Sequence, residues 1–149
     1  MVEFYKSEHL QQCVDLFAET YNRPPWNNRW TAETATRHLQ EIMSHSRFVG
    51  FVLWDKDEMI GAALCYEKTW WSNDELYIHE FFIAPRFQRK GHGNTLFSAI
   101  EIYAEEQSLS NITLLTDRKK PAFGFYKKNG MAYLKNPVLM YKLKPGKGL

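Results

Sequence analysis

The chain has 149 residues, of which 44% are hydrophobic and 24% charged, a composition that supports a single packed domain over residues 1–149 and excludes wholesale disorder. Nineteen basic residues against seventeen acidic ones leave a net charge of +2, so we do not expect nucleic acid as the main partner. No apolar run approaches the roughly 20 residues that a membrane span needs. Two cysteines are too few for a disulfide framework or a zinc site, so we expect a cytoplasmic protein that uses no metal.

The hydrophobic pattern predicts a mixed α/β fold, in which a sheet of about seven strands carries four helices on its faces, in the order β-α-α-β-β-β-α-β-α-β-β. Strands are expected at residues 2–5, 48–54, 59–66, 75–83 and 112–116, and a terminal hairpin at 132–134 and 138–143. Ser7 and Thr31 are expected to cap the first two helices, and Asn94 to open the third. The fourth is expected to begin at Pro121 and to end before Gly130.

The most informative segment joins the strand expected at 75–83 to the helix that follows it, and consists of Gln88, Arg89, Lys90, Gly91, His92, Gly93 and Asn94. The two glycines let the backbone take positive φ and approach a ligand closely, so that successive amides can point inward as an anion-binding nest. The first amides of the helix carry the positive end of its dipole, and Arg89 and Lys90 add full charges. The segment therefore predicts a site for a phosphate or a pyrophosphate.

Two common phosphate-binding motifs are absent. Leu96 stands where the dinucleotide fingerprint G-x-G-x-x-G needs its third glycine, and no G-x-x-x-x-G-K-[ST] occurs. What remains is a strand that ends in a hydrophobic residue and Pro85, then Gln88-x-x-Gly91-x-Gly93, then a helix. This pattern resembles the central motif of the GNAT superfamily of acyl-CoA-dependent N-acyltransferases, which reads [QR]-x-x-G-x-[GA].

A second stretch, residues 121–131, resembles the family's helix that ends in A-x-x-F-Y-x-x-x-G-F, with Tyr126 at the tyrosine position. Met131 replaces the usual aromatic residue. Lys119 stands three residues before Ala122, where the family often has an asparagine that contacts the cofactor. Both motifs lie in register, at the right separation and in the family's order of elements, so the resemblance extends through the whole chain. It implies the family's fold, a mixed α/β fold with a mostly antiparallel, twisted sheet.

The resemblance implies acetyl-CoA as the co-substrate. Its pantetheine arm would lie along the backbone of Phe81, Phe82 and Ile83, and its pyrophosphate on the amides of residues 89–94. The strands at 77–83 and 112–116 would splay apart to admit the thioester, whose carbonyl a backbone amide near Phe82 would polarise. The acetyl group would pass directly to an amine, without a covalent enzyme intermediate.

Tyr126 is expected to protonate the leaving thiolate, and Glu80 to remove the amine proton, directly or through water. Each has a second interpretation: Tyr126 could be a packed helix residue, and Glu80 a strand carboxylate paired with a neighbour. His79 has the opposite strand parity to Glu80, so in a regular strand only one of them faces the groove. We expect His38 to be a surface or packing residue.

The expected acceptor is a primary amine of a small molecule, such as an aminoglycoside-like polyamine or an amino-acid-like metabolite. Trp26, Trp30 and Tyr77 are the candidates for contacts with it, since Trp26 and Trp30 lie in the connection that forms a wall of the family's acceptor groove. Two alternatives stay open: a protein N-terminus or lysine as the acceptor, and a non-catalytic acyl-CoA-binding module. A homodimer is a further expectation, because exchange of C-terminal strands makes dimers common in the family.

Overall fold

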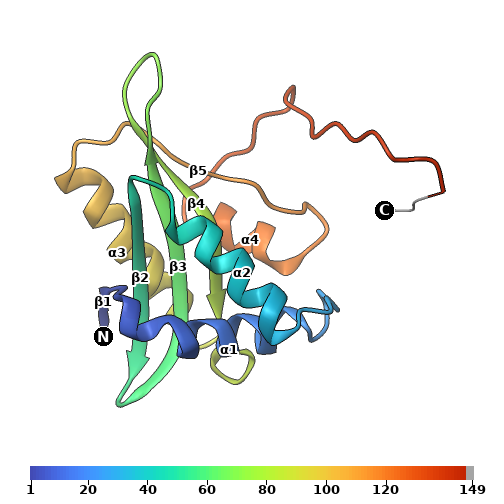
Figure 1. The fold of residues 1–149 in the computed structure, drawn as a ribbon. Coiled ribbons are helices and arrows are strands. Elements are labelled where there is room, and N and C mark those ends of the chain that lie inside the picture. The colour runs from blue at the N-terminus through green and yellow to red at the C-terminus, as the bar shows by residue number, and fades with distance from the viewer. Residues whose placement is uncertain (147–149) are drawn as a thin grey trace.

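The computed structural model describes residues 1–146, which contain one five-stranded sheet in the order β1-β2-β3-β4-β5 (Figure 1). Strands β1 to β4 pair antiparallel, and β5 runs parallel to β4. The parallel step at the edge follows from the helix that connects these two strands. The strand bounds are β1 (Val2–Phe4), β2 (Phe48–Asp55), β3 (Glu58–Lys68), β4 (Glu75–Ile83) and β5 (Ile112–Leu114).

Helices cover both faces of the sheet (Figure 1). Helices α1 (Leu10–Tyr21) and α2 (Ala32–Met43) pack on one face, whereas α3 (His92–Glu106) and α4 (Pro121–Lys128) pack on the other. Two 3₁₀ turns, η1 (Ser7–His9) and η2 (Pro85–Phe87), precede α1 and α3. Thr31 caps α2 as predicted, because its side-chain oxygen accepts a 3.0 Å hydrogen bond from the amide of Thr34.

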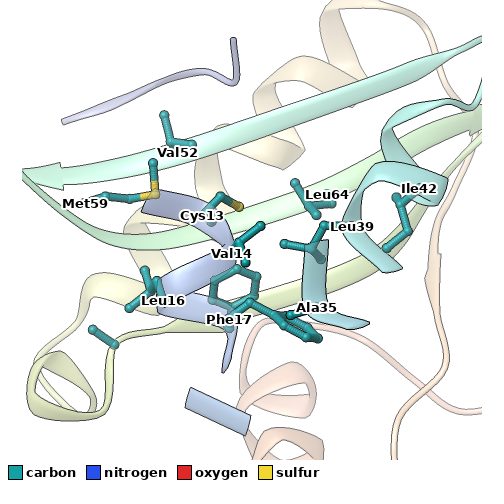
Figure 2. Packing of buried hydrophobic residues seen from close by; sticks show 13 residues of the cluster. Cys13, Val14, Leu16, Phe17, Ala35, Leu39, Ile42, Val52, Met59 and Leu64 are labelled. Atoms are coloured by element: carbon teal, nitrogen blue, oxygen red, sulfur yellow. The ribbon is translucent and has the colours of Figure 1, made fainter. Parts of the chain in front are cut away.

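The sheet separates two hydrophobic clusters, because successive side chains along a strand point to opposite faces. Figure 2 shows the first cluster, in which α1 and α2 place apolar side chains against the sheet. Phe17 and Leu39 are 1% and 0% exposed there. Burying one such side chain stabilises the fold by about 1.5–3 kcal/mol. These helices therefore hold a fixed position over the middle of β3 and β4.

The sheet has five strands where we predicted about seven, because residues 132–146 form no strand in the structure. This arm leaves the domain instead of returning to the sheet (Figure 1). Leu134, Val138 and Met140 are 79%, 73% and 82% exposed on it. A hairpin that is not packed on a third strand is marginal in water, and the described residues bring no further strand to this edge. Within residues 1–146, no helix combines the length and the hydrophobicity that crossing a membrane requires.

Candidate active site

Strands β4 and β5 separate part of the way along the sheet. Their parallel pairing runs from Leu76 opposite Ile112 to Ile78 opposite Leu114, and β5 ends there while β4 continues to Ile83. Residues 79–83 of β4 are therefore unpaired on this side, although β3 still pairs with them on the other side. The predicted splay between the two strands is present.

The backbone groups on this free edge can be identified from their partners. The hydroxyl of Tyr21 donates to the carbonyl oxygen of Phe81 at 3.1 Å, and Nε2 of Gln88 donates to that of Ile83 at 2.9 Å. The amide of Ala84 instead donates to Ile60 of β3 at 2.7 Å. Because the N–H and C=O of one strand residue point to the same side, the amides of Phe81 and Ile83 face the gap. The amide of Phe82, the residue around which we predicted the polarising donor, faces β3.

A cavity of about 530 Å³ fills the gap between the strands. Glu80 and Phe81 line it from β4, Asp117 from the chain after β5, and Tyr126 from α4. Trp26 and Tyr21 close it from the side of α1. A volume in this range is typical of pockets for small molecules. Both predicted proton-transfer residues therefore line one cavity.

Three side chains meet at its base as a His–Glu–His cluster of His38, His79 and Glu80. Nε2 of His38 lies 2.9 Å from Oε1 of Glu80, and Nδ1 of His79 lies 3.8 Å from the same oxygen. His79 and Glu80 share a side because β4 is bulged: Glu80 pairs with Leu64 and Ile78 with Cys65, which leaves His79 as the extra residue. The parity argument, which holds for a regular strand, was wrong here.

The contacts within the cluster shift the pKa values of Glu80 and His79 in opposite directions. Burial alone would raise the pKa of Glu80, but interactions with His38 and His79 outweigh it, and this pKa lies below the usual 4.5. The Glu80 carboxylate raises the pKa of His79 above 6.5 against the opposing effect of partial burial. At neutral pH Glu80 is therefore an ionised carboxylate beside an imidazole with increased proton affinity.

Tyr126 is buried in the second hydrophobic cluster but reaches the cavity with its hydroxyl end. Its ring packs against Phe81 and Phe97 at centroid distances of 5.9 and 6.4 Å. Burial first, and then the charge of Glu80, raise the pKa of Tyr126 above its usual 10.0. The hydroxyl therefore stays protonated at neutral pH and remains a proton donor. Among the described residues it has no hydrogen-bond partner.

The glycine segment has the predicted positive φ at Gly91 but not at Gly93, which lies inside α3, where a Cβ would come within 2.9 Å of the Phe125 ring. Arg89 has φ 61° and Gly91 φ 86°, and Gly91 is the N-cap of α3, which begins at His92 rather than at Asn94. A Cβ on Gly91 would have nothing within 4 Å, so the backbone here lies open. In the described part of the chain, the amides of residues 89–94 donate to no carbonyl of the surrounding loops. The residues present therefore fit a diphosphate, with Arg89 and Lys90 exposed beside it.

The three predicted aromatic contacts lie in different surroundings. Trp26 lines the cavity. Trp30 does not line it but stacks on His38, with ring centroids 4.9 Å apart and planes inclined by 22°. Tyr77 packs against Tyr66 of β3 at 5.2 Å and is absent from the cavity lining.

His38 is the residue that sequence reasoning missed. It lies at the spacing of Ala35 and Ile42, the buried stripe of α2, and this position was the signal that it points inward. The donor atoms of the His–Glu–His cluster all lie within 4.8 Å of one another, a spacing that one divalent cation could bridge. The hydrogen bond between His38 and Glu80 explains their close approach without an ion. The absence of a metal requirement stays a prediction.

Comparisons with known proteins identify the family and the fold. The model of the acetyltransferase (GNAT) family matches residues 10–131. Similar solved structures include an aminoglycoside acetyltransferase from an uncultured soil metagenomic sample in complex with trehalose, which is 20% identical at a TM-score of 0.75 over 97% of this chain and 96% of that one. A probable acetyltransferase is 16% identical at a TM-score of 0.79 over 97% and 99% of the two chains. The aminoglycoside N-acetyltransferase AAC(6')-Iy, in complex with CoA, is 13% identical at a TM-score of 0.75, over 95% of this chain and 93% of that one. No curated protein matches the chain.

Proposed function

Because the chain belongs to the GNAT family of acetyltransferases, we propose that it transfers an acetyl group from acetyl-CoA to a primary amine of a small molecule. One observation carries the proposal: an open amide loop at the start of α3 and a cavity with two proton-transfer groups lie on the same free edge of β4. The loop supplies binding for a diphosphate, and the cavity supplies room for a reaction beside it.

The donor side rests on backbone groups. The amides of residues 89–94 would hold the pyrophosphate, and the free edge of Phe81 and Ile83 would hold the pantetheine arm as an added strand. The carbonyls of these two residues are already engaged by Tyr21 and Gln88, so their amides are the groups left to donate. The Phe81 amide, which faces the gap, is the donor suited to polarise the thioester carbonyl.

The acceptor side is acidic and aromatic. Glu80 and Asp117 contribute carboxylates to the cavity, and no lysine or arginine is among the described residues that line it. Trp26 adds an aromatic ring, over which Nζ of Lys120 already lies 5.6 Å from the centroid, so a bound amine would use the rest of the ring surface or displace that lysine. This lining suits a positively charged amine of small size. Aminoglycosides, on which some of the similar structures act by name, are one such class. The cavity has the volume of a small-molecule pocket, and Trp26 narrows one side of it, which favours a small molecule over a protein N-terminus or lysine.

The chemistry starts with the amine proton, since amines of lysine type have a pKa near 10.4 and are mostly protonated at neutral pH. That proton passes to the His–Glu–His cluster, in which Glu80 is the group predicted from the sequence, acting directly or through water. The free amine attacks the thioester carbonyl carbon, and the Phe81 amide stabilises the oxyanion. Collapse of this intermediate breaks the C–S bond, and Tyr126 gives its proton to the thiolate. The amine nitrogen, which gains a positive charge on attack, loses a second proton, and that proton restores the hydroxyl of Tyr126. The products are an amide and the free thiol of CoA.

We also propose a homodimer, for which the C-terminal arm provides support. Leu134, Val138 and Met140 on the arm are 79%, 73% and 82% exposed, whereas Leu139 of the arm and Leu115, just beyond β5, line the cavity. Apolar surface of this extent marks an interaction site in a folded protein. Light scattering is expected to give twice the mass of one chain for the full protein and the mass of one chain for a variant that ends at Met131. A monomeric full-length protein would contradict the dimer.

The function is tested by thiol release from acetyl-CoA over a panel of amines that includes an aminoglycoside, a polyamine, amino acids and a lysine peptide. The proposal predicts release with small polycationic amines and little with the peptide. Release with the peptide alone would identify a protein acetyltransferase. Binding of acetyl-CoA without release by any amine would indicate a non-catalytic acyl-CoA-binding module.

A further inference from the structure

His79 is the one member of the His–Glu–His cluster that is open to both neighbouring cavities. It lines the cavity of about 530 Å³ together with Glu80 and Tyr126. It also lines a second cavity of about 240 Å³ between α2 and β3. Its side chain is 36% exposed, against 17% for Glu80. A ligand in the larger cavity can therefore reach the His79 ring more readily than the carboxylate behind it.

The two nitrogens of His79 have different surroundings. Nδ1 faces Oε1 of Glu80 at 3.8 Å, a separation longer than that of a hydrogen bond. A small movement of the ring would form this hydrogen bond when the imidazole becomes positively charged. In the described part of the chain, Nε2 has no hydrogen-bond partner. A carboxylate next to Nδ1 favours the tautomer with the hydrogen on that atom. This tautomer leaves a lone pair on Nε2, free to accept a proton.

Glu80 is poorly placed to take a proton itself. Its Oε1 is shared between His38 and His79, and a carboxylate held ionised by two imidazoles is a weak base. The same arrangement lowers the pKa of Glu80 and raises that of His79. A base accepts a proton more effectively when its pKa lies near the working pH, which favours the imidazole.

We infer that Nε2 of His79 accepts the proton of the acceptor amine, and that Glu80 and His38 are positioning residues that hold the ring and balance its charge. The inference rests on the proposed N-acetyl transfer and names its base. The proton moves from the amine nitrogen to Nε2, and the nitrogen keeps the electron pair with which it attacks the thioester. The resulting imidazolium lies beside the Glu80 carboxylate and returns its proton to water through the exposed cavity before the next turnover.

His38 has a defined part in this arrangement. Its Nε2 donates to Glu80 while its ring stacks on Trp30, so helix α2 fixes one face of the carboxylate. The other charged or titratable groups around His79 come from α2, β3 and β4: Glu41 and His45 across the smaller cavity, and Tyr66 and Tyr77 beside the ring. Across the larger cavity lie Asp117, Tyr21 and Tyr126. Glu80 is the nearest acid to the ring, so its removal is expected to have the largest effect on it.

The test is the pH dependence of kcat/KM with an amine that the wild-type protein acetylates. His79→Gln is expected to lower kcat/KM about 100-fold or more and to remove the acidic limb, because general-base catalysis contributes roughly 10²–10⁴-fold. Glu80→Gln is expected to move the acidic limb to lower pH, since the ring loses its neighbouring charge. A role in folding alone would lower the rate equally at all pH values. His45→Gln, which alters an exposed imidazole of the smaller cavity, is the matched control and should keep the wild-type profile.

Two further measurements distinguish a wrong assignment of the base from a misfolded variant. Acetyl-CoA affinity equal to that of the wild type confirms that each variant is folded. NMR titration of the His79 ring is expected to give a pKa above 6.5 that falls in Glu80→Gln. A His79→Gln variant that keeps the acidic limb and a rate within about threefold of the wild type would overturn the inference alone. A wild-type protein that acetylates no amine would overturn the proposed function, and this inference with it.

Discussion

Nε2 of His38 on helix α2 lies 2.9 Å from Oε1 of Glu80 on strand β4, although 42 residues separate them in the chain. The contact ties a helix on one face of the sheet to the bulge at its splayed edge. Because Trp30 stacks on the same imidazole, the loop before α2 is part of this support. The orientation of Glu80, and through it that of His79, therefore depends on how α1 and α2 pack.

Tyr126→Phe removes the hydroxyl and keeps the ring that packs against Phe81 and Phe97. We expect kcat to fall about 100-fold with acetyl-CoA affinity unchanged, because only proton donation to the thiolate is lost. Thiol release and binding titration measure the two quantities. Tyr103→Phe is the control, since that tyrosine donates to Glu67 away from the cavity. An unchanged kcat in Tyr126→Phe would remove this residue from the reaction.

Gly91→Val tests the diphosphate loop. A residue other than glycine in the left-handed conformation costs about 1–2 kcal/mol, and a β-branched residue such as valine costs more. The backbone at position 91 should therefore abandon its φ of 86°, and the amides of the loop should turn away from the ligand. We expect acetyl-CoA to bind at least tenfold more weakly. Gly124→Ala is the control, because its Cβ would meet nothing within 4 Å in α4 and alanine suits a helix. Wild-type affinity in Gly91→Val would contradict the loop as the binding site.

Trp26→Ala is expected to raise KM for the amine about 2- to 30-fold, the equivalent of a cation–π contact of roughly 0.5–2 kcal/mol. Acetyl-CoA affinity should not change, since Trp26 lies far along the chain from residues 89–94, which we propose hold the pyrophosphate, and lines the cavity from the side of α1. Trp30→Ala provides the contrast. It should lower the melting temperature, because that ring packs on Phe17 and His38. Equal effects of the two variants on KM would mean that Trp26 has no special contact with the amine.

The stability of the protein should depend on the Glu80–His79 pair within a limited range of pH. Glu80 has a folded pKa below 4.5, so its contribution is present above that value and lost as the pH falls. His79 has a folded pKa above 6.5, so its contribution is present below 6.5 and lost as the pH rises. The melting temperatures of wild type and Glu80→Gln should therefore differ most between about pH 4.5 and 6.5. A difference that is constant with pH would contradict the pairing.

Most of the fold could be predicted because its signals are local. Apolar periodicity and caps such as Thr31 identified all four helices and the five strands that the structure contains. The terminal hairpin could not be predicted correctly in this way, because a strand forms only when another strand pairs with it. The sequence pattern of residues 132–143 does not identify that pairing strand. A second chain is the partner that we propose.

The site was harder to predict than the fold. The motifs identified Tyr126, Glu80 and the glycine loop, since each lies in a recognisable stretch of sequence. The role of His79 was hidden by the bulge in β4, which reverses the expected parity and leaves no mark on the hydrophobic pattern. His38 comes from another element, and only the packing of α2 over β4 brings it to Glu80. The amide that we propose as the polarising donor is that of Phe81 for a similar reason, because strand pairing decides which way each amide points.

The central claim is that this protein acetylates a small cationic amine. The most direct measurement is mass spectrometry of an aminoglycoside or polyamine incubated with the protein and acetyl-CoA. We predict a mass gain of one acetyl group on the amine, released with an equal amount of CoA thiol, and loss of both in Tyr126→Phe. Unmodified amines across the whole panel, from a protein that still binds acetyl-CoA, would contradict it.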